Sequence, residues 1–383
     1  MSSTFELNSS YYTTIIDGSS TLDGFSVSVT DPVNETGIAY MLPPYIRMTS
    51  MVIVIVVMVL GIIGNLMVPL VVLRGKDLRN STNIFLVNLS VADLCVLLVC
   101  APTVLVEINS GPQVWPLGEH MCKAVPFVEL TVAHASVLTI LAISFERYYA
   151  ICEPLRAGYI CTKARATFLC FLAWIFAAVC ASPMIWVSQY AKMGPNGSHE
   201  ETKEDSRIPV CLMQATTTST TVFILLLTTA FFLVPLLILL MLYSMVVRHL
   251  IHDSSTSTAD SYHTRARRQV VLMLLTVVFS FFICLAPFKI FTSYIVLAPT
   301  EDIDAIDLDT YFNILYFSRV MCYLNSAINP ILYNLMSSRF RLGFLKLCGL
   351  RRRSRTDRST TRSTLTTRSS RRTIFNDQQE NFL

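Results

Sequence analysis

The chain has 383 residues, of which 53% are hydrophobic and only 15% are charged. This balance excludes an ordinary water-soluble globular protein and indicates a membrane protein. The formal net charge of +4 combines basic and acidic loops that lie in different parts of the chain, so it gives no support for nucleic-acid binding.

Residues 1–47 are expected to form an extracellular, glycosylated tail. Glycosylation sequons start at Asn8 and Asn34, and a third starts at Asn196 in a later loop. No cleavable signal peptide is visible before residue 40, so we expect the first membrane span to act as the insertion signal.

Seven apolar segments follow, each long enough to cross roughly 30 Å of hydrocarbon, which takes about 20 helical residues. They cover residues 48–73, 82–106, 120–152, 165–187, 217–249, 266–297 and 310–334. We therefore expect an all-α membrane protein, with a seven-transmembrane helix bundle over 48–335 and a short amphipathic helix over 336–348.

The loop charges predict how this bundle is oriented. Lys and Arg gather in the loops that begin near Arg74, Arg147 and Arg248 and in the C-terminal tail, whereas acidic residues such as Glu200 and Asp302 gather in the other loops. Cytoplasmic loops carry the excess of Lys and Arg. A multi-pass protein of the plasma membrane is expected, with its N-terminus outside and its C-terminus in the cytoplasm.

Two of the eleven cysteines stand apart from the others. Cys122 opens the third span and Cys211 lies in the outer loop before the fifth, so both face an oxidising compartment. They are placed to form a disulfide that holds this loop over the bundle; two free thiols are the alternative.

Asp93 lies in the middle of the second span, where a charged residue costs roughly 2.5–3.5 kcal/mol on insertion scales. Polar partners are available in three other spans, at Asn65, Ser136, Asn325, Ser326 and Asn329. A carboxylate surrounded by hydroxyl and amide oxygens suits a hard cation, and we expect Na⁺. The alternative is a protonated Asp93 within a hydrogen-bond network.

The motifs of successive spans, taken together and in order, resemble the rhodopsin-like (class A) G-protein-coupled receptors. They are Gly64-Asn65, Leu89 to Asp93, Cys122, Glu146-Arg147-Tyr148, Trp174, Pro235 with Tyr243, Phe281 to Pro287, and Asn329-Pro330 with Tyr333. The resemblance covers about residues 45–348.

This resemblance implies a role for each inner motif. Arg147, flanked by Glu146 and Tyr148, would contact a heterotrimeric G protein after the sixth span moves outward. Tyr243 and Tyr333 would close around Arg147. The remaining switch residues would be Phe281, which packs with Val137 and Pro235 beneath the ligand pocket, and Pro330, which bends the seventh span beside Asn329.

Two positions depart from the family pattern. Leu285 stands where the family usually has Trp, so no aromatic switch can operate there. Arg265, Arg267 and Arg268 stand near the start of the sixth span, where many members carry an acid that pairs with the arginine of the third span. We therefore expect some basal activity.

The C-terminal segment is predicted to contact lipid and regulatory proteins. Phe340 and Phe344 share one face of the amphipathic helix, and Cys348 at its end is a palmitoylation candidate. Residues 349–383 alternate Arg with Ser and Thr and are expected to be disordered. In this family, such a tail implies phosphorylation by receptor kinases and binding of arrestin; contact with anionic lipid is an alternative that is compatible with both.

The outer halves of the spans carry charges of both signs. Glu129, Lys289 and Arg319 are candidate ligand contacts, with Phe127, Tyr294, Tyr316 and Phe317 as apolar wall. Both signs suit a peptide better than an amine or a lipid. Alternatively, these charges pair with one another and are structural.

Within the class, the run from Cys122 to Leu155 and the segment Asn80 to Phe85 look most similar to arthropod ecdysis-triggering hormone receptors. That resemblance implies a C-terminally amidated peptide and signalling through Gq, phospholipase C and calcium. Receptors of thyrotropin-releasing hormone or neuromedin U type are the alternative, in the branch that also holds the ghrelin receptors.

The other classes considered are a transporter, a channel and an enzyme. No internal repeat of the transporter kind is apparent. No cofactor is expected besides the Na⁺, and no catalytic residues are apparent. His134 is the only histidine well inside a span, and we expect it to be packed and hydrogen-bonded rather than a metal ligand.

Overall fold

The computed structural model describes residues 42–75, 78, 80–111, 114–193, 208–213, 218–256, 261–299, 302–303, 305–347 and 349. Asn8, Asn34, Asn196 and Cys348 lie outside the described residues. The predictions of glycosylation and palmitoylation therefore stay predictions.

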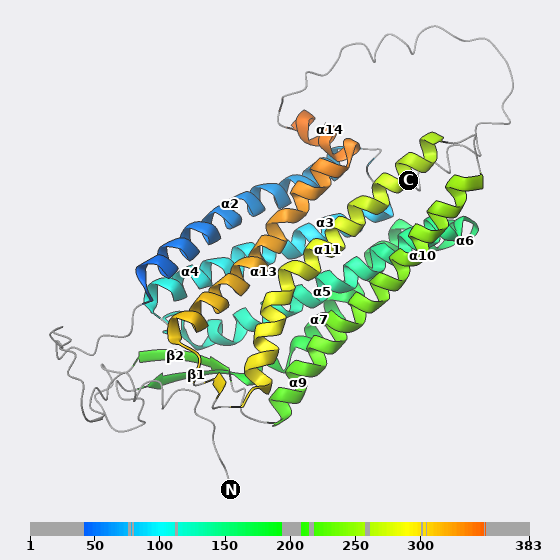
Figure 1. Ribbon diagram of the computed structural model, residues 1–383. Helices are drawn as coiled ribbons and strands as arrows, with labels where there is room; N and C mark the ends of the chain where they lie inside the picture. Colours follow the sequence, from blue (N-terminus) through cyan, green and yellow to red (C-terminus); the bar gives the residue numbers. More distant parts are fainter. Residues whose placement is uncertain are drawn as a thin grey trace, which may run out of the picture.

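Seven long helical segments form a bundle (Figure 1). They are α2 (Pro44–Arg74); α3 (Ser81–Cys95) continued by η2 (Val96–Cys100) and α4 (Ala101–Ser110); α5 (Gly118–Cys152); α7 (Lys163–Ala181) with α8 (Met184–Val187); α9 (Thr218–Thr228) continued by η4 (Thr229–Leu233) and α10 (Val234–Thr256); α11 (Ser261–Leu297); and α13 (Leu308–Met336). Two shorter helices lie outside the bundle, α6 (Pro154–Ile160) and α14 (Ser338–Leu347).

Six helices among the described residues are long and apolar enough to cross a membrane. The helix α13 is not one of the six, because its many Asn and Tyr side chains lower its hydropathy. It is nevertheless 29 residues long and packs between α2 and α11. The seven-helix bundle that the sequence predicts is therefore present.

Local capping explains where several helices begin. The side chains of Asn80, Thr162 and Asp307 accept hydrogen bonds from backbone N–H groups in the first turns of α3, α7 and α13. Such caps satisfy donors that a helix N-terminus leaves unpaired. The π-helical segments η2 and η4 were not predicted, because an extra residue per turn leaves no pattern in an all-apolar stretch.

Glycine allows α2 to approach α13 closely. A Cβ on Gly64 would lie 2.9 Å from Cβ of Pro330, and a Cβ on Gly61 would lie 3.2 Å from Cβ of Ala327. Both distances are too short for ordinary side-chain contact. The Pro330 ring of α13 is thus packed directly on the backbone of α2.

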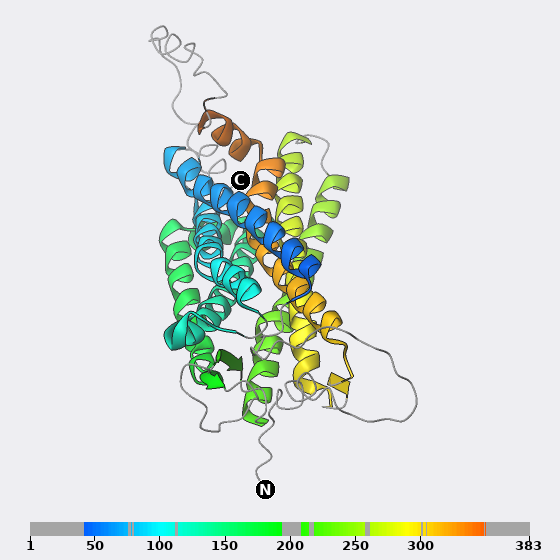
Figure 2. The same cartoon turned by 90° about the vertical axis from the view of Figure 1, so that its left-hand side faces the viewer.

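The outer end of the bundle carries a β-hairpin that the sequence did not predict. The strands β1 (Ser188–Met193) and β2 (Ile208–Met213) pair antiparallel, with Tyr190 opposite Cys211. A disulfide joins Cys211 to Cys122 at the start of α5, which confirms the predicted bridge. Both views place this hairpin and α14 at opposite ends of the bundle (Figures 1 and 2).

Candidate functional site

Near the outer end, one ion pair joins two helices. Nη1 of Arg319 in α13 lies 2.5 Å from Oε2 of Glu107 in α4, and the two side chains are 27% and 15% exposed. Arg319 was predicted as a ligand contact, and the structure gives it a partner within the protein. Sequence reasoning missed Glu107 because the second span was expected to end at residue 106.

Two further charges lie beside this pair. Glu129 of α5 interacts electrostatically with Arg319 and with Lys289 of α11. Both Glu129 and Lys289 are partly accessible, and within the described residues neither forms a hydrogen bond or a close ion pair. They are therefore the two charges of the cluster that a bound molecule could pair with.

The predicted aromatic wall is only partly gathered around this cluster. Tyr316 is buried, stacks on Phe312 with ring centroids 6.2 Å apart, and lies within electrostatic reach of Glu107 and Arg319. Phe127 is half-buried. Tyr294 is 46% exposed and Phe317 is 59% exposed, so Tyr316 is the one of the four predicted aromatic residues that is fully buried.

Midway along the bundle, Asp93 lies in a polar network that links α2, α3 and α13. Nδ2 of Asn329 donates to Oδ2 of Asp93 at 3.0 Å, and Nδ2 of Asn65 donates to the carbonyl oxygen of Ser326 at 2.8 Å. Asn329 thus acts toward Asp93 as a donor, whereas the prediction had counted it among the oxygen ligands.

The residues predicted to hold a cation with Asp93 include further buried oxygen atoms. Oδ1 of Asn65 and Oδ1 of Asn325 are buried acceptors that lack a hydrogen-bond partner in the described part of the chain. Ser136 and Ser326 are buried as well. Carboxylate, amide and hydroxyl oxygens are the ligands that hard cations prefer. These residues would hold Na⁺, which supplies positive charge beside the buried Asp93 carboxylate.

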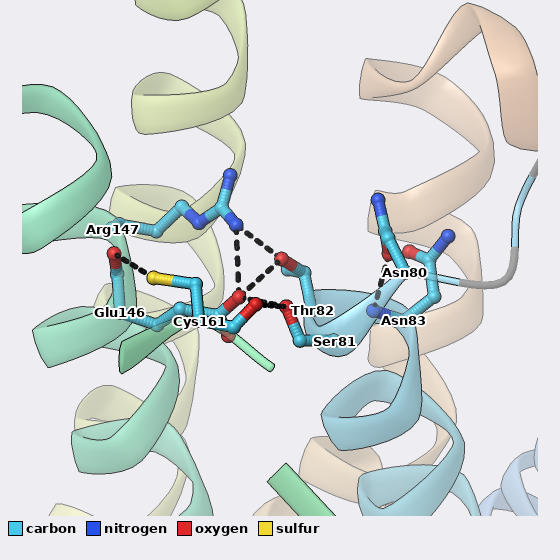
Figure 3. A network of polar contacts seen from close by, with 7 residues as sticks. All are labelled: Asn80, Ser81, Thr82, Asn83, Glu146, Arg147 and Cys161. Carbon is cyan, nitrogen blue, oxygen red and sulfur yellow. Dashed lines mark hydrogen bonds and ion pairs between the residues drawn. The ribbon is translucent and has the colours of Figure 1, made fainter. Parts of the chain in front are cut away.

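At the inner end, Glu146 and Arg147 are buried and bonded to one another (Figure 3). Nη2 of Arg147 lies 3.3 Å from Oε1 of Glu146. Ser81 and Thr82, at the start of α3, both donate hydrogen bonds to the same Oε1 atom. Arg147 also donates to the hydroxyl of Thr82. The predicted pair is therefore in contact, and it is bonded to α3 as well.

No hydrogen bond joins Tyr243 or Tyr333 to Arg147 among the described residues. The hydroxyl of Tyr243 lies 3.1 Å from Oγ of Ser144, one turn from Arg147 on α5. Tyr333 is buried against Phe340, and its hydroxyl has no partner among the described residues. Tyr148 is half-buried. The two tyrosines therefore do not close around Arg147 in this structure.

His134 and Phe281 are both packed in the core. The His134 ring stacks on Phe231 of η4, with centroids 3.8 Å apart. Neither ring nitrogen has a hydrogen-bond partner among the described residues, so His134 is packed as expected but not hydrogen-bonded. Phe281 is buried and contacts Phe282 edge-on.

These features define a class of protein. Seven membrane helices, an outer hairpin held by a disulfide, and a buried Glu-Arg pair at the inner end are the architecture of a seven-helix membrane receptor. The sequence model of the family described as "7 transmembrane receptor (rhodopsin family)" matches residues 64–333, which is well over half of the chain. The chain belongs to this family; it is a multi-pass membrane receptor and not an enzyme.

Named relatives lie in the same family. The chain is similar to the growth hormone secretagogue receptor type 1 of Homo sapiens, with 33% identity over 296 residues that cover 76% of this chain and 78% of the relative. It is 29% identical to the thyrotropin-releasing hormone receptor of Gallus gallus over 344 residues, which cover 83% and 84%. A QRFP-like peptide receptor of Branchiostoma floridae is 35% identical over 146 residues, 38% of each chain.

Proposed function

We propose that this protein is a plasma-membrane receptor for an extracellular peptide hormone or neuropeptide, which it reports to a heterotrimeric G protein. The observation that carries the proposal is the pair of opposite charges Glu129 and Lys289, which lie on α5 and α11 within electrostatic reach of one another but form no close ion pair among the described residues. The relatives support it, because their names are those of peptide and hormone receptors.

The charges of the site favour a peptide with a cationic side chain and a polar end. Glu129 would pair with an arginine or lysine of the ligand, and Lys289 would bind the polar terminus. Arg319 is already bonded to Glu107, so its charge is balanced before any ligand arrives. We assign it to shaping the site, with Tyr316 beside it as apolar wall.

We further propose that the ligand is C-terminally amidated and similar to ecdysis-triggering hormone, and that the receptor signals through Gq, phospholipase C and calcium. The motif resemblance from Cys122 to Leu155 supports this assignment. A ligand of thyrotropin-releasing hormone or neuromedin U type is the second candidate, favoured by the similarity to the thyrotropin-releasing hormone receptor.

The inner end of the bundle would transmit the signal to the G protein. Arg147 would contact the G-protein α subunit once it leaves Glu146, and Na⁺ beside Asp93 would favour the resting state. The amphipathic α14, with Phe340 buried and Arg341 exposed, would lie on the cytoplasmic lipid surface. Receptor kinases and arrestin would act on the Ser- and Thr-rich residues 349–383.

Calcium imaging of cells that express the receptor, challenged with a panel of amidated peptides, tests the proposal. The active peptide should then lose at least about thirtyfold in potency at Glu129→Lys, since a cation of the ligand would meet a like charge. Glu119→Lys is the matched control, because Glu119 lies on the same helix but is exposed at its outer end. Unchanged potency at Glu129→Lys, with normal surface expression, contradicts the assignment.

A further inference from the structure

The inner end of this receptor lacks one restraint on Arg147 that a neighbouring helix could supply. The helix α11 (Ser261–Leu297) contains no Asp or Glu in its whole length. No carboxylate of α11 can therefore pair with Arg147. Yet Arg147 is buried rather than extended toward the cytoplasm, so other groups hold it.

Thr82 bridges the Glu146–Arg147 pair. Its hydroxyl accepts a hydrogen bond from Nη2 of Arg147 and donates one to Oε1 of Glu146 at 3.3 Å. Figure 3 shows the Thr82 side chain pointing from α3 into the gap between the two charged groups. A hydroxyl can serve both charges at once, because it carries one proton and two lone pairs.

Ser81 and Cys161 extend these bonds to the second inner loop. The Ser81 hydroxyl donates to Oε1 of Glu146 and lies 3.4 Å from the carbonyl oxygen of Cys161. The Cys161 thiol in turn lies 3.7 Å from the carbonyl oxygen of Glu146, as its donor. Burial raises the pKa of the Cys161 thiol to about 11, so the thiol keeps its proton at neutral pH.

We propose that Ser81, Thr82 and Cys161 form a hydroxyl latch that holds the Glu146–Arg147 pair at rest in place of an acid on α11. Thr82 and Ser81 bond the charged groups directly, whereas Cys161 is a positioning residue that fixes the second inner loop against them. This inference rests on the proposed coupling to a G protein, for which Arg147 must leave Thr82.

The Glu146–Arg147 pair has few hydrogen bonds that could replace those of the latch. Oε2 of Glu146 and Nε of Arg147 have no hydrogen-bond partner in the described residues, so a single carboxylate oxygen receives the bonds. Loss of one hydroxyl leaves two buried charges with fewer partners, which raises the free energy of the resting state. The population of the state with Arg147 released must then rise.

The test measures ligand-free nucleotide exchange. The full-length receptor is placed in lipid nanodiscs with purified Gq heterotrimer, and binding of GTPγS is followed without peptide. Thr82→Val keeps the side-chain shape without the hydroxyl, and we expect about fivefold faster exchange than in the wild type. Thr82→Ser should restore the wild-type rate, and Cys161→Ala should raise the rate by about twofold.

Two matched controls separate the latch from general loosening of the fold. Thr103→Val makes the same change at a buried threonine whose hydroxyl bonds to Cys100 within its own helical segment. Cys170→Ala changes a cysteine that as a residue is 8% exposed, like Cys161, but lies in α7 and forms no hydrogen bond with the pair among the described residues. Both should keep the wild-type rate. Equal rates for Thr82→Val and Thr103→Val in a receptor that couples to Gq overturn the latch.

A second measurement does not need the G protein. The rate at which N-ethylmaleimide labels Cys161, followed by mass spectrometry, should rise at Thr82→Val if the second inner loop separates from Glu146. If neither the wild type nor any variant promotes exchange, even with active peptide, the proposed coupling to Gq fails. The labelling then decides the latch alone: faster labelling supports it, and an unchanged rate overturns it.

Discussion

The two ends of the bundle use their ionic pairs differently. At the outer end, Arg319 and Glu107 lie on different helices and are 212 residues apart in the chain. At the inner end, Arg147 and Glu146 are neighbours on one helix. A pair between helices opposes their separation, whereas a pair within one helix does not. Among the residues that the structure describes, the inner helices can therefore separate without breaking an ion pair between them.

The two ends also differ in what attaches their loops to the helices. The outer end has a disulfide that ties the β1–β2 hairpin to α5, and Trp115 donates its backbone N–H to Pro209 of β2 at 2.8 Å. At the inner end, the described contacts of the Glu146–Arg147 pair with α3 and the second inner loop are hydrogen bonds. We infer that the outer end keeps its shape while the inner end changes, as a receptor that signals inward requires.

We expect the largest effect from removing the disulfide, because this bridge fixes the outer hairpin to α5. The bridge closes a separation of 89 residues, and its loss at Cys211→Ala should lower the free energy of unfolding by about 4 kcal/mol. Thermal unfolding of the purified receptor measures the change. Cys180→Ala, at a free cysteine of α7, is the control and should unfold near the wild-type temperature. Equal unfolding temperatures for the two variants would remove the covalent basis of a fixed outer end.

The second-largest loss of stability is expected from breaking the Glu107–Arg319 pair. Arg319→Ala leaves the Glu107 carboxylate partly buried without its partner, and we expect a loss of about 3 kcal/mol in the free energy of unfolding. Exchange of the two charges, by Glu107→Arg with Arg319→Glu, should recover much of this loss.

Lys123→Ala supplies the contrast for that pair. Lys123 also lies 2.5 Å from a carboxylate, that of Glu119, but both side chains are well exposed and belong to one helix. Its removal should leave the unfolding temperature unchanged, because water screens the pair. Similar losses for Arg319→Ala and Lys123→Ala would show that the outer pair does not hold two helices together.

The features that the sequence predicted are local or depend on motifs. Apolar length predicted all seven spans, and the motif of Asn325, Asn329 and Pro330 marked the last of them, α13, as one whose polar groups lie inside a bundle. The Cys122–Cys211 bridge followed from the side of the membrane on which each cysteine lies. The pair of Glu146 with Arg147 is sequential and therefore needs no knowledge of the fold.

The features that sequence reasoning missed are contacts between residues that are far apart in the chain and meet only in the folded protein. Glu107 becomes informative only when α13 brings Arg319 beside it, 212 residues later. Ser81 and Thr82 are ordinary residues for the start of a helix until α5 places Glu146 against them. The hairpin was missed because its short strands pair across an outer loop, and such pairing has only a weak local pattern.

The smallest effect should come from the bonds that tie α3 to α5 and α7 between the two ends. Nε1 of Trp174 donates to Oδ1 of Asn88 at 2.9 Å, and Nδ2 of Asn88 donates to Thr139 at 2.9 Å. Trp174→Phe removes one bond and should cost about 1 kcal/mol in the free energy of unfolding. If α3 must stay on α5 for the latch to close, this variant should also raise ligand-free nucleotide exchange, but less than Thr82→Val does. A rise as large as that of Thr82→Val would show that helix packing holds the inner end as much as the bonds to Arg147 do. The inner end would then resemble the outer end, where an ion pair and a disulfide hold separate elements together.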